Sequence, residues 1–412
     1  MRAVILTIGD EILVGQITDT NSAWLSKQLT AEGIEVTEKR SVRDDDQAIT
    51  NALQECASRA DLLILTGGLG PTPDDRTLSV LSHWLQIPLK LDEAYFEKIR
   101  AYFAKRGPEV VEYNRNQALR LAAGEVLPNP KGSARGSWVK HGQVWIACLP
   151  GVPYEMKEMT TVELIPRIRS EFSLQPIQHE YIMTAGLGES TLASRIQGIE
   201  QCFPPGMTLG YYPELGVVKL RLSASASKVS AEQLRLQADQ IAVMLGDHVF
   251  AREEIRIEEM IARLLQWKKM KLALAESCTG GYLSHLITAM PGSSVYYAGG
   301  VVSYSNEMKS QVLGVNPQLI REQGAVSEAV VQAMAEGIKQ QTGADYAIAI
   351  SGVAGPGGGN DEKPVGTVCI AILSPQGVTT RTVSLFRTRM ENIRGAAHTA
   401  LFLLYKAIHQ QT

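Results

Sequence analysis

The sequence predicts an α/β protein built from three domains, and three observations lead to this interpretation. The chain has 412 residues, more than one hydrophobic core usually organises. Apolar runs of strand length alternate with stretches of helical periodicity towards both ends of the chain, which is typical of parallel sheets covered by helices. The pattern changes in between, so we expect domains over residues 1–172, 173–252 and 253–412.

The composition excludes several classes of protein. Hydrophobic residues make up 45% and charged residues 20% of the chain, with a formal net charge of -3, as in ordinary globular proteins. Lysines and arginines are scattered, so we expect no nucleic-acid partner. No segment reaches the roughly 18 to 20 apolar residues that cross a membrane, so we expect a cytoplasmic protein without a membrane partner. The five cysteines are widely spaced without a CxxC pair, which predicts reduced thiols.

The N-terminal domain begins with segments in β-α-β-α-β order. Residues 2–8 form an apolar run of strand length, and residues 34–42 and 60–66 are the next two predicted strands. Helical spacing of apolar residues fills the intervals over about 20–33 and 44–58. This order favours a parallel sheet with covered faces.

The third of these strands ends in a glycine-rich loop, TGGLGPTPDDRT, at residues 66–77. Ligands of parallel sheets lie beyond the carboxyl ends of the strands, where glycine-rich backbone can approach phosphates closely. Asp74 and Asp75 offer the hard oxygen atoms that cations prefer. The same two residues also suit the cap of a helix that begins near Arg76, and the sequence leaves both roles open.

Three segments of this domain, GDEILVGQITDTNSAWLSKQL, TGGLGPTPDDRT and LPGVPYEM, resemble the N-terminal domain of the CinA family (competence/damage-inducible protein A). The resemblance implies a fold similar to that of molybdopterin-binding proteins and a metal-dependent ADP-ribose pyrophosphatase activity. A divalent metal ion, with or without a monovalent cation, would be held by Asp74 and Asp75. The residues that we expect to bind the nucleotide are Asp10, Glu11, Asn21, Gly67, Gly68, Gly70, Thr72, Asn116, Asn129 and Ser133.

The middle segment has a different character. GVVKLRLSAS alternates apolar and charged residues, which predicts a half-buried strand. The resemblance implies a small KH-like α+β domain here, and RNA-binding KH modules hold the RNA backbone with a GXXG loop. The nearest candidate, Gly186 to Glu189, ends in an acid where a phosphate needs a base. We therefore interpret this loop as structural.

The C-terminal domain contains a sharp strand-to-helix connection. LALAESCTGGYLSH, residues 272–285, is an apolar strand followed by a turn at 277–281 and a helix with apolar residues at helical spacing. Backbone N–H groups at the start of that helix are expected to stabilise an oxyanion. Segments 299–315 and 346–373 also follow apolar strands, and they bring Tyr304, Lys309 and Ser351 to the same edge of the sheet.

A hydrolytic site at this edge needs a base. The one histidine of these segments, His285, is interpreted as a surface or packing residue, whereas a buried lysine with a lowered pKa can accept a proton. Ser277, Tyr304 and Lys309 would then form a Ser–Lys type of site. Cys278, an intrinsically stronger nucleophile, and Thr279 remain alternatives to Ser277.

The segments AESCTGG, YSNEMK and SGVAGPGGG look like the C-terminal domain of the CinA family and its stand-alone relatives, the nicotinamide-nucleotide amidases. The resemblance implies an amidase without a cofactor that converts nicotinamide mononucleotide to nicotinate mononucleotide and ammonia, in pyridine-nucleotide recycling. Ser277 would be the nucleophile, and Tyr304 and Lys309 its activating neighbours. The expected substrate-binding residues are Thr279, Gly280, Gly281, Ser351, Gly352, Arg389 and Arg394, with Arg387 a further candidate for the phosphate.

Two other functional classes stay open at this point. A molybdopterin-type binding protein would use only the first 170 residues or so of the chain. A non-catalytic partner in DNA uptake or recombination would not need the Ser277, Tyr304 and Lys309 set, and it would be expected to carry a basic stripe. We expect instead an enzyme with two activities on small-molecule nucleotides, assembled as a homodimer.

Overall fold

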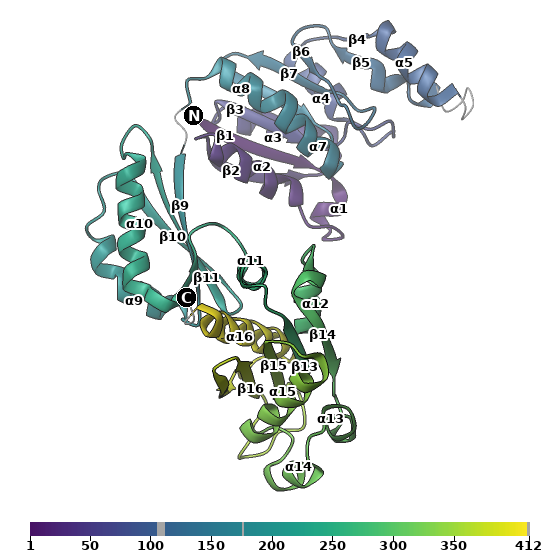
Figure 1. Ribbon diagram of the computed structural model, residues 1–412. Coiled ribbons are helices and arrows are strands. Elements are labelled where there is room, and N and C mark those ends of the chain that lie inside the picture. The colour runs from purple at the N-terminus through teal and green to yellow at the C-terminus, as the bar shows by residue number, and fades with distance from the viewer. Residues whose placement is uncertain (105–111, 175–176, 410–412) are drawn as a thin grey trace. The chain divides into compact units, whose positions relative to one another are not determined.

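The computed structural model describes residues 1–104, 112–174 and 177–409 of the chain. The chain divides into two compact units, Met1–Gln178 with Ser225–Ser227, and His179–Ala224 with Lys228–Thr412. The predicted α/β fold class is confirmed in both, as the ribbons show (Figure 1). None of the helices in these ranges combines the length and apolar character that a bilayer crossing requires.

The first unit contains a six-stranded sheet in the order β2-β1-β3-β8-β7-β6. Four strands are parallel: β1 (Arg2–Ile8), β2 (Glu35–Val42), β3 (Leu62–Thr66) and β8 (Val144–Leu149). The predicted order of the first three strands and their helices is therefore confirmed. Two antiparallel strands that the sequence did not reveal, β7 (Gly136–His141) and β6 (Glu125–Leu127), extend the sheet.

Helices cover both faces of this sheet. On one face lie α2 (Thr20–Ala31), α7 (Pro153–Met159) and α8 (Ile165–Glu171), whose side chains share a core with Ile5 and Ile64. On the other lie α3 (Asp46–Ala57) and α4 (Thr77–Leu85), which pack on Leu6 and Leu65. The short helix α1 (Asp10–Leu13) follows β1, and the one π-helical turn described, η3 (Thr160–Leu164), joins α7 to α8.

A smaller group of helices and strands lies beside the six-stranded sheet. It consists of β4 (Leu89–Leu91), β5 (Leu119–Leu121), α5 (Glu93–Phe103) and the 3₁₀ turn η2 (Arg115–Ala118). The side chain of Asp92 caps α5 by accepting a hydrogen bond from the Tyr95 N–H. Phe96, Ile99 and Phe103 form a separate apolar cluster under this helix.

The second unit begins with the KH-like part, whose sheet has the order β10-β11-β9-β12. Its elements are β9 (Ile177–Ala185), α9 (Glu189–Glu200), β10 (Met207–Glu214), β11 (Val217–Ser225), α10 (Ala231–Leu245), η4 (Gly246–His248) and β12 (Val249–Ala251). Every second residue of β11 is buried, as the alternation predicted. Gly186 follows β9 at φ +77, and a Cβ there would lie 2.2 Å from the Phe402 ring. This close approach agrees with a structural role for the loop.

The remaining sheet has the order β14-β13-β15-β16-β17. Its strands are β13 (Leu272–Glu276), β14 (Tyr297–Val302), β15 (Tyr346–Gly352), β16 (Thr367–Ser374) and β17 (Gly377–Ser384), of which the first three are mutually parallel and the last two antiparallel. The carboxyl ends of β13, β14 and β15 therefore meet at one edge. This edge gathers the three motif segments that the sequence singled out.

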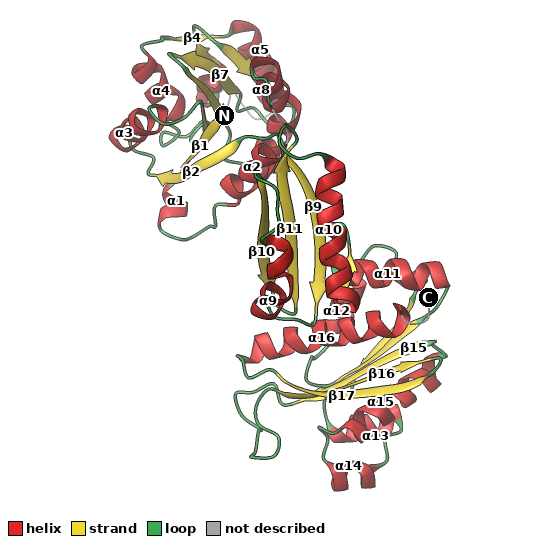
Figure 2. Ribbon diagram, turned by 90° about the vertical axis from the view of Figure 1, so that its left-hand side faces the viewer, coloured by secondary structure: helices red, strands yellow, loops and turns green. Residues whose placement is uncertain are grey.

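Two helical layers enclose this sheet, with α16 on one side and α15 on the other (Figure 2). The helices are α11 (Ile257–Lys268), α12 (Tyr282–Thr288), α13 (Asn306–Leu313), α14 (Pro317–Gln323), α15 (Glu328–Thr342) and α16 (Arg389–His409), with a 3₁₀ turn η5 (Ser293–Val295). Ser305 caps α13, because its hydroxyl accepts a hydrogen bond from the Met308 N–H at 3.1 Å.

Candidate active site

The turn after β13 is organised by Glu276, a residue that the sequence analysis did not single out. Its buried carboxylate accepts hydrogen bonds from the N–H groups of Gly281 (3.1 Å), Leu283 (3.0 Å) and Ser284 (2.8 Å). It also accepts one from the Ser284 hydroxyl at 2.6 Å. Glu276 therefore satisfies the first turn of α12 and holds the connection that carries Ser277. An acid directly before a strand-to-helix turn was the signal available in the sequence.

This arrangement corrects the expectation for the glycines of the turn. The Gly281 N–H donates to Glu276, and the Gly280 N–H donates to the Ser277 carbonyl at 3.0 Å. The idea that these two N–H groups stabilise an oxyanion is therefore wrong, because both are already satisfied inside the turn. In the part of the chain that the structure describes, the N–H groups of Cys278 and Thr279 donate to no carbonyl or carboxylate.

Ser277 and Lys309 lie side by side in the protein interior. Lys309 Nζ is 2.9 Å from Ser277 Oγ and donates to the Ser303 carbonyl at 2.8 Å. Ser277 is 8% and Lys309 1% exposed. Burial lowers the pKa of Lys309, because the charged ammonium loses its hydration. A lysine in this position is poised to accept the proton of the serine hydroxyl.

Tyr304 takes a different place from the one expected. Its side chain is 59% exposed, and its hydroxyl accepts a hydrogen bond from Arg389 Nη2 at 2.9 Å. Its backbone carbonyl, at 3.4 Å, is the atom that meets Lys309 Nζ. The described geometry thus joins Ser277 to Lys309 directly and does not place the Tyr304 hydroxyl between them.

Of the two arginines expected to bind substrate, the structure brings only Arg389 to the site. Arg389 Nη1 donates to the Gly355 carbonyl at 2.5 Å, so this side chain links Tyr304 to the glycine-rich loop after β15. Arg394 is exposed further along α16. Its charge acts on His398, whose pKa is lowered mainly by burial and further by Arg394.

The loop after β15 is held by internal bonds. Ser351, expected to face the substrate, is buried and donates its hydroxyl hydrogen bond to the Ala325 carbonyl at 2.7 Å. A Cβ on Gly352 would lie 2.8 Å from the Thr367 carbonyl oxygen, so this glycine permits close strand pairing. Asn392, which the sequence analysis missed, donates to the Ala354 carbonyl at 3.1 Å and accepts from the Arg387 N–H at 3.0 Å. It ties the loop to the first turn of α16.

The neighbouring alternatives to Ser277 are less suited to nucleophilic attack. Cys278 is buried, and burial raises the pKa of its thiol to about 12, so the reactive thiolate is disfavoured. Thr279 is 3% exposed, and its hydroxyl oxygen has no hydrogen-bond partner among the described residues. Neither side chain forms a hydrogen bond with a base, as Ser277 does with Lys309.

A second candidate site is a cavity of about 460 Å³ at the carboxyl edge of the first sheet. A Cβ on Gly67 would lie 2.1 Å from the Ile8 carbonyl oxygen, so only glycine fits at this φ of +112. Asn116 lies in an adjoining smaller cavity that shares Gly68, Gly70 and Asp75 with the first. The predicted residues that line the larger cavity are Glu11, Gly67, Gly68, Gly70, Asp74, Asp75 and Ser133.

Other predicted residues of this domain build the edge of the cavity. Asn21 donates to the Thr66 hydroxyl and to the Gly151 carbonyl, and so connects the ends of β3 and β8. Asn129 accepts from the N–H groups of Lys131 and Gly132 and shapes the loop that they belong to. The Asp10 N–H donates to Asp44 Oδ2 at 3.0 Å.

The carboxylates around the cavity fit a hard cation in part. Asp44, missed by the sequence analysis, lines the cavity, and its pKa is raised by burial and by the charges of Glu11, Asp10 and Asp74. Such mutual repulsion is relieved when a divalent cation binds. One oxygen of Asp75 is occupied, however, because it accepts from the Thr72 N–H and hydroxyl. Within 1–104, 112–174 and 177–409, no three acidic, histidine or cysteine side chains form a ready metal cluster.

Fold and sites together define a multidomain α/β protein with a buried Ser–Lys pair in its last domain and a glycine-lined cavity in its first. Three families match: "Probable molybdopterin binding domain" over residues 4–170, "Damage-inducible protein CinA KH domain" over 179–251 and "CinA C-terminal domain" over 254–408. The chain belongs to the CinA family, which confirms the resemblance noted in the sequence.

Two relatives agree with this assignment in sequence. The chain is 40% identical to a CinA-like protein of Cytophaga hutchinsonii over 410 residues, covering 99% of this chain and 98% of the relative. It is 40% identical to a CinA-like protein of Chlorobaculum tepidum over 381 residues, covering 91% and 90%. The crystal structure of the competence damage-inducible protein A (ComA) from Klebsiella pneumoniae is 36% identical, with a TM-score of 0.37, and matches 38% of this chain and 97% of that one.

Proposed function

We propose that the C-terminal domain hydrolyses the carboxamide of nicotinamide mononucleotide to give nicotinate mononucleotide and ammonia. The observation that carries this proposal is the 2.9 Å contact between Lys309 Nζ and Ser277 Oγ in a buried setting. A nucleophile bonded directly to a base of lowered pKa is the arrangement that amide hydrolysis needs. The named substrate comes from the family resemblance, and the chemistry of the pair supports the class of reaction.

The proposed reaction has two halves. Neutral Lys309 removes the Ser277 hydroxyl proton while Oγ bonds to the carboxamide carbon, and the N–H groups of Cys278 and Thr279 stabilise the oxyanion. Lys309 then returns the proton to the leaving nitrogen, the C–N bond breaks and ammonia departs. Water, deprotonated by the same lysine, attacks the ester carbon. The C–Oγ bond then breaks, Lys309 returns the proton to Oγ, and the carboxylic acid leaves with Ser277 free again. No cofactor takes part.

Ammonia release from nicotinamide mononucleotide tests this proposal. Ser277→Ala and Lys309→Ala should each abolish most turnover, and the double variant should be scarcely slower than either, because the pair acts as a unit. Cys278→Ser should keep most activity. If Cys278→Ser abolishes turnover while Ser277→Ala retains it, or if an acyl adduct is found on another residue, the proposed nucleophile is wrong.

We also propose a metal-dependent ADP-ribose pyrophosphatase activity for the N-terminal domain. The support is the glycine-lined cavity with Glu11, Asp44 and Asp74 on its walls. A bound divalent cation would neutralise the charge of a diphosphate there. Asp74 is exposed on the wall of the cavity, whereas Asp75 shapes the loop through Thr72.

AMP release from ADP-ribose, with and without a divalent metal ion, tests the second activity. Asp44→Asn and Asp74→Asn should each lower metal-dependent AMP release, while ammonia release from nicotinamide mononucleotide stays unchanged. Equal AMP release by variants and parent would remove these aspartates from the mechanism.

The homodimer remains a prediction. The absence of a nucleic-acid partner is also a prediction, and tight, salt-sensitive binding of RNA or DNA would contradict it.

A further inference from the structure

The second unit contains a cavity of about 310 Å³ that none of the proposed catalytic residues lines. Its walls come from β9, from the ends of β10 and β11 that face their connecting turn, from β12 and the segment after it, and from α11 and α16. A Cβ on Gly216, in that turn, would lie 2.9 Å from the His398 Cβ, so the turn packs closely against α16. The volume is at the lower end of the range for small-molecule sites.

One wall of this cavity carries a buried carboxylate without a partner. Glu258 is the second residue of α11, lines the cavity and is 3% exposed. Within residues 1–104, 112–174 and 177–409, its side chain forms no hydrogen bond and no ion pair. Burial of a carboxylate in this state costs the folded protein free energy, because the charge loses its hydration without compensation.

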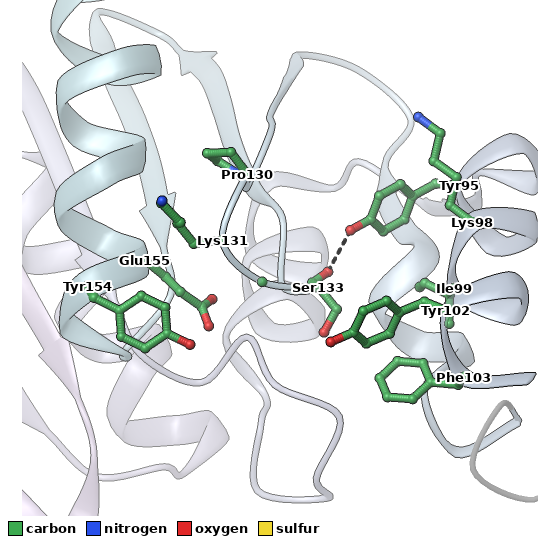
Figure 3. Close-up of a pocket in the computed structure, with 11 residues that line it drawn as sticks. Tyr95, Lys98, Ile99, Tyr102, Phe103, Pro130, Lys131, Ser133, Tyr154 and Glu155 are labelled. Carbon is green, nitrogen blue, oxygen red and sulfur yellow. Dashed lines mark hydrogen bonds between the residues drawn. The ribbon is translucent and has the colours of Figure 1, made fainter. Parts of the chain in front are cut away.

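The other buried carboxylates in the part of the chain that the structure describes are satisfied. Glu276 accepts four hydrogen bonds at the turn after β13. Glu155, on the wall of a hollow in the first unit (Figure 3), accepts one from Asn129 Nδ2 at 2.6 Å. Glu258 differs from both, and the difference points to an occupant of the cavity that supplies the missing positive charge.

The cationic side chains of the wall do not supply this charge. Lys219 Nζ pairs with Glu254 at 2.7 Å. Arg256 Nη2 donates to Met290 Sδ at 3.2 Å and forms no ion pair with Glu258. Both cations therefore leave Glu258 uncompensated.

The imidazole of His398, also on the wall, does not neutralise Glu258 either. Burial lowers the pKa of His398 more than the charges of Glu258 and Glu214 raise it, and Arg394 lowers it further. The ring is therefore neutral at pH 7. Glu214, exposed at the end of β10, adds a second negative charge to the wall.

The donor set and the apolar part of the wall favour an organic cation over a metal ion. No three acidic, histidine or cysteine side chains of the described ranges converge as a metal ion requires. An ammonium group needs only hydrogen-bond acceptors, and one buried carboxylate can hold it. The remaining wall is apolar and is formed by Met183, Val217, Phe250, Ile255 and Ile257.

We propose that this cavity binds a protonated primary amine with a short apolar chain. The ammonium group donates to Glu258, and the apolar chain contacts the side chains of Phe250 and Ile257. The inference goes beyond the two proposed activities and does not depend on them, since neither Ser277 nor Asp74 lines this cavity.

Titration of the full chain with n-butylammonium, n-butanol and ammonium, followed by ligand-observed NMR, tests the proposal without any turnover. Butylammonium should bind at least about tenfold more tightly than butanol, which has the same chain without the charge. It should also bind at least about tenfold more tightly than ammonium, which has the charge without the chain. Equal affinities for butylammonium and butanol would overturn the proposal. Ammonium binding as tight as that of butylammonium would show a site for a bare cation and would overturn the assigned ligand class.

The variant Glu258→Gln locates the binding at this cavity. It should lower the affinity for butylammonium to that for butanol and leave butanol binding unaltered. Glu232→Gln is the matched control, because Glu232 is likewise the second residue of its helix, α10, but is exposed and does not line the cavity. The control should keep both affinities. Unchanged butylammonium binding by Glu258→Gln would place the amine elsewhere and contradict the proposal.

Thermal unfolding without ligand separates this role from a structural one. Removal of an uncompensated buried charge should leave the Tm of Glu258→Gln equal to that of the parent or raise it. Butylammonium should raise the Tm of the parent and of Glu232→Gln, but not that of Glu258→Gln. A lower Tm of Glu258→Gln without ligand would mean that the carboxylate stabilises the empty protein, and the reason for expecting a cationic occupant would be lost.

Discussion

Replacing Glu276 by glutamine tests whether the turn that carries the nucleophile depends on this carboxylate. One carboxylate oxygen accepts from the Gly281 and Leu283 N–H groups, and the other accepts from the Ser284 N–H and hydroxyl. Glutamine has nearly the same shape, but one of its two terminal atoms is an NH₂ group that cannot accept. Whichever way the amide is turned, two donors that are buried or partly buried lose their acceptor.

The size of the effect follows from this count. A buried donor left unsatisfied costs about 1 to 3 kcal/mol, so the substitution should lower the free energy of unfolding by about 2 to 6 kcal/mol. In a unit of this size, 1 kcal/mol corresponds to about 2 to 4 °C, so the Tm should fall by about 4 to 24 °C. Ser277 lies at the start of the loosened turn, and its distance to Lys309 should become variable. We therefore expect kcat to fall more than KM changes.

Differential scanning calorimetry and steady-state ammonia release measure both effects in Glu276→Gln. Thr288→Ala is the matched control on the same helix, because its exposed hydroxyl donates only to the carbonyls of its own helix. The control should keep Tm and kcat. A Tm change of less than about 2 °C in Glu276→Gln together with an unchanged kcat would refute the assigned role, since it would mean that the four hydrogen bonds contribute little.

Further predictions concern the same domain. Because the pKa of Lys309 is lowered in the folded state, the unfolded state binds the proton of this lysine more readily. The free energy of unfolding should therefore rise with pH between the folded pKa and the ordinary lysine pKa. Lys309→Met should remove this rise in denaturation curves measured at different pH values. The amidase rate should rise as the pH passes through the folded pKa of Lys309 and then level off, because only neutral Lys309 accepts the proton; a rate that falls there would contradict the assignment. Arg389→Ala should raise KM for nicotinamide mononucleotide while Arg394→Ala leaves it unchanged, and the reverse pattern would place the substrate elsewhere. In thiol labelling at pH 8 the exposed Cys202 should react quickly and the buried Cys278 slowly, and equal rates would show that Cys278 is accessible as a thiolate.

Much of the local structure was determined by the sequence itself. The apolar run at residues 272–276, the glycines at 280 and 281 and the helical spacing after them predicted the strand, turn and helix that present Ser277. These features depend on backbone preferences and on burial patterns within about a dozen residues, which are encoded locally. The same holds for the β-α-β-α-β order of the first unit, whose parallel sheet follows from the order of its elements. Motif resemblance then supplied the family.

Only the tertiary structure decided which side chains meet. Tyr304 and Arg389 are 85 residues apart in the chain, and their hydrogen bond depends on where the loop after β14 and the start of α16 come together. In the first unit, the acids of the glycine-lined cavity come from separate segments of the chain, so Asp44 had no sequence signal of its own. The sequence led us to expect Ser351 to face the substrate, but its hydroxyl donates a hydrogen bond to the Ala325 carbonyl in the interior. The physical reason is that hydrogen-bond partners and burial are set by packing between distant segments, which the local pattern of residues does not encode.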